Sequence, residues 1–377
     1  MSSILTLSFY YWIITFSIIG YGLLFNKLFL GSSERDIGFI GINGIFVLIF
    51  ISYLSSFFLP HTKLFNSILL LIGLINFSIN TKIIQKNIKD LIIIFTILMI
   101  FIFVSKNHDD FPYYHFPYTH LLTEYSNMIG LGNFNHGFKT HSSIFYLSSL
   151  FNLPFTNLFL LHLSPVFFMG FANIILYNKI LSYLEEKNPS FIFYLSLLSF
   201  IFINVFFVRL GEHGTDRSAM ILIIIIIIEL LYLTNKKRIV DKKLFLKLLI
   251  FITLIVSLKT FYVLYGLLLI PLIFYFNKNK VSLIFFLKSK ITYLCLIMII
   301  FLLTVNFFNS GCLLYPVKLT CFESFSWSTK INEVEQMNIW YQQWAKAGAN
   351  PNFRIENPEV YIKNFNWVSN WIDMYFF

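Results

Sequence analysis

Long runs of apolar residues recur along the chain, separated by short polar stretches. Two of them, LIIIFTILMIFIFV at 91–104 and MILIIIIIIELLYL at 220–233, carry one charged residue between them, and lysine-rich turns bound such runs. About 20 apolar residues form a helix long enough to cross the hydrocarbon core of a membrane. The pattern predicts ten membrane spans, at 4–25, 37–59, 64–79, 91–105, 155–176, 190–208, 218–234, 246–258, 261–276 and 291–309.

The composition excludes a soluble globular protein. Hydrophobic residues make up 57% of the chain and charged residues only 12%, whereas soluble domains carry about 25% charged residues. The first apolar run has no basic segment before it and no small-residue cleavage site, so we interpret it as a retained span and not as a signal peptide. The predicted fold is an all-α polytopic membrane protein with a transmembrane domain over 1–309.

Lysines and arginines gather in alternate loops, and this bias predicts the orientation of the chain. Loops on the cytoplasmic side carry the excess of these residues. The residues that we assign to this side are Lys27, Arg35, Lys82, Lys86, Lys89, Lys179, Lys187, Lys236, Lys237, Arg238, Lys242, Lys243, Lys247, Lys278, Lys280, Lys288 and Lys290. The segment 310–377 then lies on the outer, periplasmic or extracellular face of a bacterial cytoplasmic membrane. The net charge of +10 is in this interpretation a signal of topology, assisted by anionic lipids, and does not indicate nucleic-acid binding.

The apolar stretch 248–276 has basic loops on both sides, so both of its ends should be cytoplasmic. We therefore predict a hairpin of two short spans, with Lys259 and Thr260 at its apex toward the outer face. A lysine within the membrane is costly unless it faces water or an anion. Lys259 could accordingly face an anionic ligand, or it could extend its ammonium outward into water.

Residues 105–154 form a polar layer on the outer face, and we call its part at 106–141 the acid–histidine island. The island holds five of the eight histidines. Prolines in HDDFPYYHFPYTH break a regular helix, YTHLLTEYSNMIG predicts a short interfacial helix, and HSSIFYLSSLFNLPF predicts a half-helix that enters the membrane without crossing it. A connection of this length is unusual without a function.

Asp109 and Asp110 follow directly after a predicted span, where a carboxylate can be partly desolvated. Partial burial or a like charge nearby raises the pKa of a carboxylic acid, which suits a general base for a hydroxyl acceptor. The two carboxylates could instead hold a divalent cation such as Mg²⁺ or Mn²⁺. The alternative is that two acids at a helix end only border the membrane interface.

The histidines of the island lack the spacing of a zinc site. His115 and His120 are five residues apart, as are His136 and His141, whereas an i, i+4 spacing places two imidazoles on one helical face. Neither a nearby cysteine nor an HExxH motif accompanies them. We expect these side chains to donate hydrogen bonds to phosphate or sugar, or to lie at the interface.

The loop VRLGEHGTDRSA carries Arg209, Glu212, Asp216 and Arg217 between two predicted spans. A guanidinium group binds phosphate or pyrophosphate bidentately. The two arginines could instead pair with Glu212 and Asp216 and simply close the loop. Glu229 lies in the following span near its cytoplasmic end, where we expect it to face the helix bundle or extend to the interface.

Cys312 and Cys321 are nine residues apart on the predicted outer face, where an oxidising compartment favours a disulfide over two free thiols. A disulfide that closes so short a loop contributes about 2–3 kcal/mol. Beyond residue 322, tryptophans, tyrosines and Asn-Pro turns predict a segment at the membrane interface, although such rings also stack on sugars. The ending WIDMYFF is typical of the start of another span, so we expect the chain to be part of a longer protein.

Together these motifs resemble an uncharacterised bacterial family of multi-pass membrane proteins. The resemblance covers about residues 105–350 and rests on Asp110-x-x-x-Tyr114-His115, Glu124-Tyr125, GLGNFNHGFKTHSS, GTDRSA, the Lys259 apex, SGCLLYPV and Trp344-Ala345. Two positions depart from the family pattern. Ile129 stands where a proline is usual, and FNHGFKTH lacks the arginine expected after the glycine–asparagine element.

That family is similar in layout to the GT-C glycosyltransferases, so the resemblance implies a GT-C-like fold and sugar transfer at the outer face. The donor would be a sugar linked to polyprenyl phosphate, and the acceptor a saccharide, a lipid or a protein. The resemblance implies Asp110 as the general base, with Asp109 as helper or metal ligand.

The resemblance also implies residues that hold the substrates. Tyr114, His115 and Glu124 would bind and position them. Lys259, with Arg209 or Arg217, would neutralise the donor phosphate, which is the electrostatic requirement of such a transfer.

Other functions make different demands on the sequence. A transporter or flippase for lipid-linked saccharides would need inverted repeats and charges at mid-membrane, and few charges occur inside the predicted spans. A polymerase or ligase of lipid-linked glycans would rely on outer-loop arginines, which are few here. A non-catalytic scaffold would not need the island.

Overall fold

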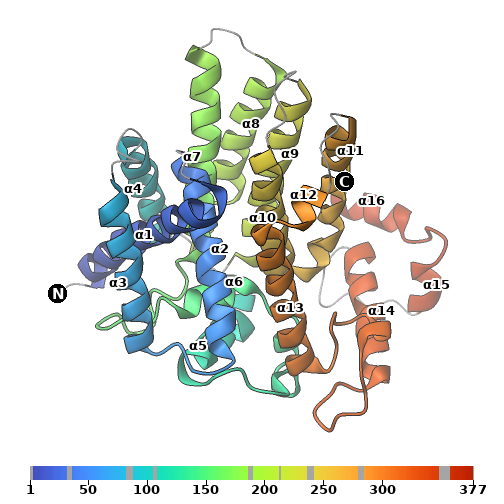
Figure 1. The fold of residues 1–377 in the computed structure, drawn as a ribbon. Coiled ribbons are helices and arrows are strands. Elements are labelled where there is room, and N and C mark those ends of the chain that lie inside the picture. Colours follow the sequence, from blue (N-terminus) through green and yellow to red (C-terminus); the bar gives the residue numbers. More distant parts are fainter. Residues whose placement is uncertain are drawn as a thin grey trace. The chain divides into compact units, whose positions relative to one another are not determined.

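In the computed structural model, helices joined by turns and loops make up the described residues (Figure 1), and no strand occurs among them. These residues are 3–31, 36–81, 88–104, 108–185, 190–211, 214–235, 242–278, 284–347 and 357–376. The chain divides into two compact units. Unit 1 comprises residues 1–127 and 141–302, and unit 2 comprises residues 128–140 and 303–377. The acid–histidine island is therefore shared between the two units.

The helices of unit 1 account for most of the apolar runs. They are α1 (Ser3–Phe25) with η1 (Asn26–Leu30), α2 (Ile37–Ser56), α3 (Lys63–Asn80), α4 (Ile88–Val104), η4 (Phe111–His115), α5 (Phe116–Glu124), α6 (Ser143–Ser149), α7 (Ser164–Glu185), α8 (Phe191–Phe206), α9 (Thr215–Asn235), α10 (Lys242–Leu258), η7 (Thr260–Leu268), α11 (Leu269–Lys278), α12 (Ile284–Leu287) and most of α13 (Lys290–Ser310).

Six helical segments of the described chain are long and apolar enough to cross a membrane, which is the character of a helical membrane protein. They are Ser3–Leu30, Ile37–Ser56, Lys63–Asn80, Ser164–Glu185, Thr260–Lys278 and Lys290–Ser310. Two of them, Lys63–Asn80 and Thr260–Lys278, bury only 17% and 11% of their residues. Continuous apolar surface of this kind is rare on a protein that faces water on all sides and is expected where lipid surrounds it.

Each of the ten predicted spans overlaps a helix, but the fifth begins at the wrong residue. Residues 155–163, which we predicted as the start of a span, form turns, and the helix runs instead over Ser164–Glu185. Phe155 and Asn157 have positive φ angles of 65° and 43°, which a right-handed helix does not allow. Lys179 consequently lies within α7, and not in a loop.

Glycines bring the first three helices of unit 1 into close contact. A Cβ atom on Gly20 of α1 would lie 1.9 Å from the carbonyl oxygen of Gly73 in α3, and one on Gly22 would lie 1.9 Å from that of Ile40 in α2. Small residues allow such close backbone contact between helices in membranes, where packing replaces the hydrophobic effect as the force between helices.

Polar contacts define two ends of the bundle that α2, α7, α9 and α10 form. At one end, the Asp36 carboxylate caps α2 by accepting from the Gly38 N–H (2.8 Å) and also accepts from the Asn178 amide of α7 (3.1 Å). Lys179 of α7 and Glu229 of α9 form an ion pair near there. We call this the Asp36 end. Helices α2 and α10 start near it, whereas α7 and α9 finish near it.

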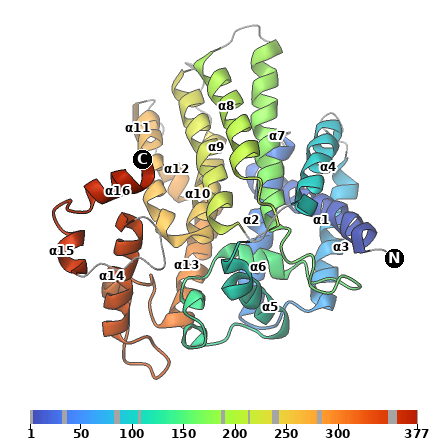
Figure 2. The same cartoon turned by 180° about the vertical axis from the view of Figure 1, so that it is seen from behind.

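The opposite end carries α5 and α6, and we call it the island end. Figures 1 and 2 show α5 and α6 together at this end, the lower one in both views. Ser142, which caps α6, donates to the carbonyl oxygen of Leu258 at the last residue of α10 (2.6 Å), and Ser257 donates to Ser143 (2.9 Å). Helix α9 finishes at the Asp36 end and α10 starts there. The loop between α8 and α9 and the residue Lys259 therefore lie at the island end.

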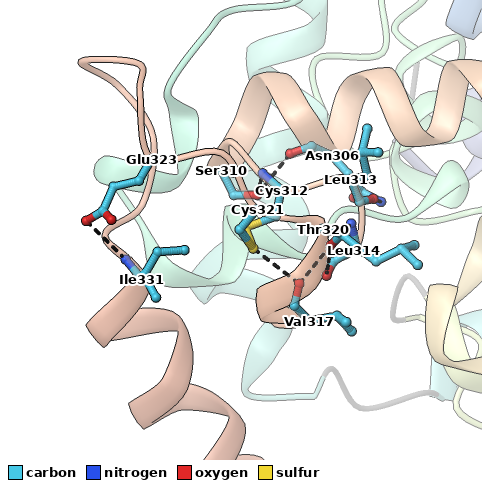
Figure 3. Close-up of a disulfide and its surroundings, with 10 residues drawn as sticks. All are labelled: Asn306, Ser310, Cys312, Leu313, Leu314, Val317, Thr320, Cys321, Glu323 and Ile331. Atoms are coloured by element: carbon cyan, nitrogen blue, oxygen red, sulfur yellow. Dashed lines mark hydrogen bonds between the residues drawn. A yellow bond between two sulfur atoms is a disulfide. The ribbon is translucent and has the colours of Figure 1, made fainter.

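Unit 2 combines one segment of the island with the chain that follows α13. Its helices are η5 (Leu131–Asn133), η6 (His136–Lys139), the end of α13, η8 (Lys318–Thr320), α14 (Ile331–Ala347), α15 (Pro358–Ile362) and α16 (Val368–Phe376). A disulfide joins Cys312 to Cys321 in the loop between α13 and α14 (Figure 3). The Leu313 N–H donates to the Thr320 carbonyl oxygen (2.9 Å) inside the same loop, so the loop is closed by both kinds of bond.

Candidate functional site

An ion pair connects two loops at the island end of unit 1. The Lys259 Nζ lies 3.0 Å from the Asp216 Oδ1. Lys259 follows the last residue of α10, and Asp216 lies in the first turn of α9. The two side chains are 42% and 50% exposed, so a ligand could reach both. Lys259 is thus at the surface of the island end, and it has a carboxylate partner that the sequence did not suggest.

The serines of the island determine where Lys259 lies. Ser142 and Ser143 belong to the motif HSS, and they bind Leu258 and Ser257 immediately before the lysine. Both serines are buried, so these hydrogen bonds form away from water and hold the end of α10 firmly against α6.

His115 lies close to this pair, buried at the end of η4. Its ring packs against the rings of Tyr114, with centroids 4.3 Å apart, and Phe145 of α6, at 5.2 Å. Burial, together with the positive charges of Lys259 and His108, lowers the pKa of His115 to about 3. The imidazole is therefore neutral near pH 7, and it can exchange a hydrogen bond but cannot supply a positive charge to a phosphate.

Asp110 is linked to His108 across one turn. The His108 Nδ1 accepts from the Asp110 backbone N–H (3.1 Å) and lies 3.6 Å from the Asp110 Oδ2. Because this nitrogen accepts a hydrogen bond, the proton of a neutral His108 is assigned to Nε2. Asp109 is exposed, and the Asp110 side chain is 46% exposed. The partial burial that we predicted for this acid pair is therefore small.

The residues predicted to bind substrate are only partly brought together. Tyr114 is half-buried beside His115. Glu124 is exposed at the end of α5, where it accepts from the Thr123 hydroxyl at 3.5 Å. No contact recorded for the described residues links Glu124 to Lys259.

Of the two arginines of this region, Arg217 is next to Asp216 in the chain, in the first turn of α9. Arg209 is exposed. Glu212, one of the two acids that could have paired with these arginines, lies outside the described residues together with His213. The other acid, Asp216, pairs with Lys259.

No group of three or more His, Cys, Asp or Glu side chains within the described ranges is arranged to hold a metal ion. Asp109 and Asp110 remain the residues that could contribute two carboxylates to a divalent cation.

Other polar residues of the island support the helices and do not face the ion pair. His141 is buried, with its Nε2 3.0 Å from the Tyr53 hydroxyl. The Tyr146 hydroxyl donates to the Asn127 amide oxygen (2.8 Å), and Asn127 in turn donates to the Ser56 hydroxyl (2.8 Å). This network attaches α5 and α6 to the end of α2, so we assign it to the scaffold.

The fold and these contacts define an all-helical membrane protein with titratable side chains gathered at one end of its bundle. Residues 1–376 match a family described as a domain of unknown function (DUF8201), and the chain belongs to that family. No curated protein and no solved structure matches the chain.

Proposed function

We propose that the protein is an integral-membrane glycosyltransferase, GT-C-like in layout, that transfers a sugar from a polyprenyl-phosphate donor to a saccharide, lipid or protein acceptor. The observation that carries this proposal is the Lys259–Asp216 pair at the island end, close enough to His115 for its charge to act on the imidazole. A lysine held at the end of a helix by a half-exposed carboxylate is positioned for an anion that arrives from the membrane.

In the proposed reaction, the acceptor oxygen forms a bond to the anomeric carbon of the sugar while the bond from that carbon to the phosphate oxygen breaks. The polyprenyl phosphate leaves with one more negative charge, which the Lys259 ammonium stabilises, assisted by Arg209 or Arg217. Asp110 takes the proton of the acceptor hydroxyl. Asp216 holds the ammonium in place before the donor binds, and neutral His115 with Tyr114 orients the sugar.

We propose further that ten helical segments cross the membrane, with α4, α8, α9 and α10 added to the six apolar segments above. The island end would face the periplasm or the exterior of a bacterial cell, because basic residues of α10 lie at the Asp36 end, with the Lys247 ammonium 4.8 Å from the centre of the Phe39 ring. The membrane lipids are then direct neighbours of the apolar faces, and the donor can enter from the bilayer.

The test is transfer of radiolabelled sugar from polyprenyl-phosphate sugars in membranes that contain the protein. We expect Lys259→Ala to lower transfer about a hundredfold or more, as removal of an oxyanion-stabilising group does, and Asp110→Asn to lower it by a similar factor. Matched controls at the other end of the bundle are Lys288→Ala and Asp90→Asn, which should transfer at the wild-type rate. Equal activity in wild type and Asp110→Asn would refute the assignment of the base.

A transporter or flippase of lipid-linked saccharides is the second candidate. The buried ion pair of Lys179 and Glu229 between α7 and α9 favours it, because charged pairs inside helical bundles often lie on transport pathways. Absence of transfer from every donor, with movement of the intact donor between the leaflets of vesicles, would establish this function in place of the first.

A further inference from the structure

Unit 2 contains a second group of polar side chains, outside the proposed transfer site. The Lys139 ammonium forms an ion pair with the Glu333 carboxylate of α14, and it lies 5.5 Å from the centre of the Tyr315 ring. The His136 ring is 5.9 Å from that of Tyr315, and its Nε2 is 3.4 Å from the Tyr341 hydroxyl. We call these five residues the Tyr315 cluster.

The Lys139–Glu333 pair is unlike an ordinary surface ion pair. The side chain of Lys139 is only 4% exposed, whereas that of Glu333 is 49% exposed. A surface pair, Lys318 of η8 with Glu335 of α14, has both side chains about half-exposed. The Glu333 carboxylate is therefore accessible at the surface, whereas the Lys139 ammonium, which has three N–H groups to donate, is buried.

The Tyr315 hydroxyl is buried and has no hydrogen-bond partner among the residues that the structure describes. Burial raises the pKa of Tyr315, and the nearby Tyr341 and Glu333 raise it further, so the hydroxyl keeps its proton and remains a donor. A buried donor without an acceptor is unfavourable, so a ligand that supplies an acceptor to this hydroxyl would gain binding energy.

The imidazole of the cluster is also neutral. Burial lowers the pKa of His136, and the charge of Lys139 lowers it further, against a smaller opposite effect of Glu333. The cluster therefore combines one cation, one anion, a neutral imidazole and two aromatic rings with hydroxyl groups, and its net charge is zero.

We infer that the Tyr315 cluster binds a neutral saccharide. Adjacent sugar hydroxyls need both a donor and an acceptor, which Lys139 and Glu333 provide side by side, and the apolar C–H face of a sugar packs against tyrosine rings. A phosphate would meet the Glu333 carboxylate and be repelled by it. The inference concerns unit 2 alone and does not depend on the transfer chemistry.

The test uses the full-length protein in detergent and saturation-transfer NMR. Four probes are the methyl glycosides of glucose, galactose, mannose and N-acetylglucosamine, and a fifth is inorganic phosphate. We expect at least one glycoside to bind and phosphate not to compete with it. Lys139→Met and Glu333→Gln should weaken the binding about tenfold or more, while the matched variants Lys318→Met and Glu335→Gln should bind as the wild type does.

The variant Tyr315→Phe separates a binding role from a structural one. It removes only an unpaired hydroxyl, so the free protein should unfold at the same temperature as the wild type or a higher one, while its affinity for the glycoside falls. The inference is overturned if no glycoside binds to the wild type, if phosphate displaces the glycoside, or if Tyr315→Phe lowers the unfolding temperature and leaves the affinity unchanged.

Discussion

The ion pair between Lys179 of α7 and Glu229 of α9 should be the most sensitive charged contact in unit 1. Its two side chains are 10% and 6% exposed, and the Lys179 ammonium also lies 4.2 Å from the centre of the Tyr232 ring. The perturbation is Glu229→Gln, which keeps the shape of the side chain and removes its charge.

The expected loss follows from what the substitution leaves behind. Removal of one partner of a buried pair costs about 3–5 kcal/mol, because the other charge stays buried without compensation. The contact with the Tyr232 ring remains and stabilises the cation by about 0.5–2 kcal/mol, so we expect a loss at the lower end, about 3 kcal/mol. The double variant Lys179→Met with Glu229→Leu removes both charges and should be about as stable as the wild type.

The assay is the free energy of unfolding in mixed detergent micelles for the wild type, the two single variants and the double variant, which together give the coupling energy of the pair. Glu335→Gln is the matched control, because its pair with Lys318 is half-exposed and should contribute less than about 1 kcal/mol. A loss in Glu229→Gln as small as that of the control would show that Lys179 does not need its partner, and the reasoning from burial would be wrong.

Two further predictions concern other parts of unit 1. Gly20→Ala should lower the free energy of unfolding by about 1–3 kcal/mol, because its Cβ would lie 1.9 Å from the Gly73 carbonyl oxygen. Gly266→Ala should not lower the unfolding temperature, because no atom lies within 4 Å of the added Cβ. Equal effects of the two substitutions would contradict the close packing at Gly20. The pKa of His115 is about 3 against a usual value of 6.5, so between these values the unfolded chain binds a proton that the folded chain does not. The free energy of unfolding should therefore fall as the pH decreases below 6.5, by up to about 1.4 kcal/mol per pH unit from this residue. His115→Gln should reduce the slope of the unfolding free energy against pH. An unchanged slope would contradict the burial of the imidazole.

The apolar pattern was sufficient to predict most of the helices, because a membrane leaves the backbone few alternatives to a helix. It was insufficient at residues 155–163, which are as apolar as a span but form turns. Apolar composition does not determine the backbone conformation of a segment, and turns that bury some of their apolar side chains, such as Leu160 and Leu161, have the same composition as a helix. The positive φ angles at Phe155 and Asn157 have no equivalent in the hydrophobic pattern.

From the sequence we named Lys259 and Asp216 separately but did not predict that they form an ion pair. Lys259 was singled out because two basic loops flank it, and that argument concerns only its own segment. Its partner Asp216 lies on a different helix, and the sequence offered Arg209 and Arg217 as nearer partners for that acid. A sequence-based search could have considered Asp216 for Lys259 only by assuming that all loops on one face meet.

The same limit applies more strongly to Lys139. The motif FNHGFKTH was judged by the arginine that it lacks, although it contains a lysine that becomes buried. The lysine packs against Glu333, which is 194 residues further along the chain, and against Tyr315, which is also distant in sequence. No local pattern could show either.

Three of the four lysine–carboxylate pairs among the described residues differ from one another mainly in exposure, and exposure separates what each can do. Lys179 and Glu229 are both buried, so their charges compensate each other and neither is accessible to a ligand from water. Lys259 and Asp216 are both half-exposed, and an arriving anion can therefore replace the carboxylate at the ammonium with little loss of solvation. Lys139 and Glu333 combine a buried cation with a half-exposed anion. A phosphate that displaced Glu333 from Lys139 would leave the Glu333 carboxylate without its cation and with a second anion beside it. A sugar hydroxyl, in contrast, can bind between Lys139 and Glu333 without separating their charges. On this argument we propose Lys259 as the phosphate-binding lysine and Lys139 as the sugar-binding one, because the opposite assignment would not fit the exposure of either pair.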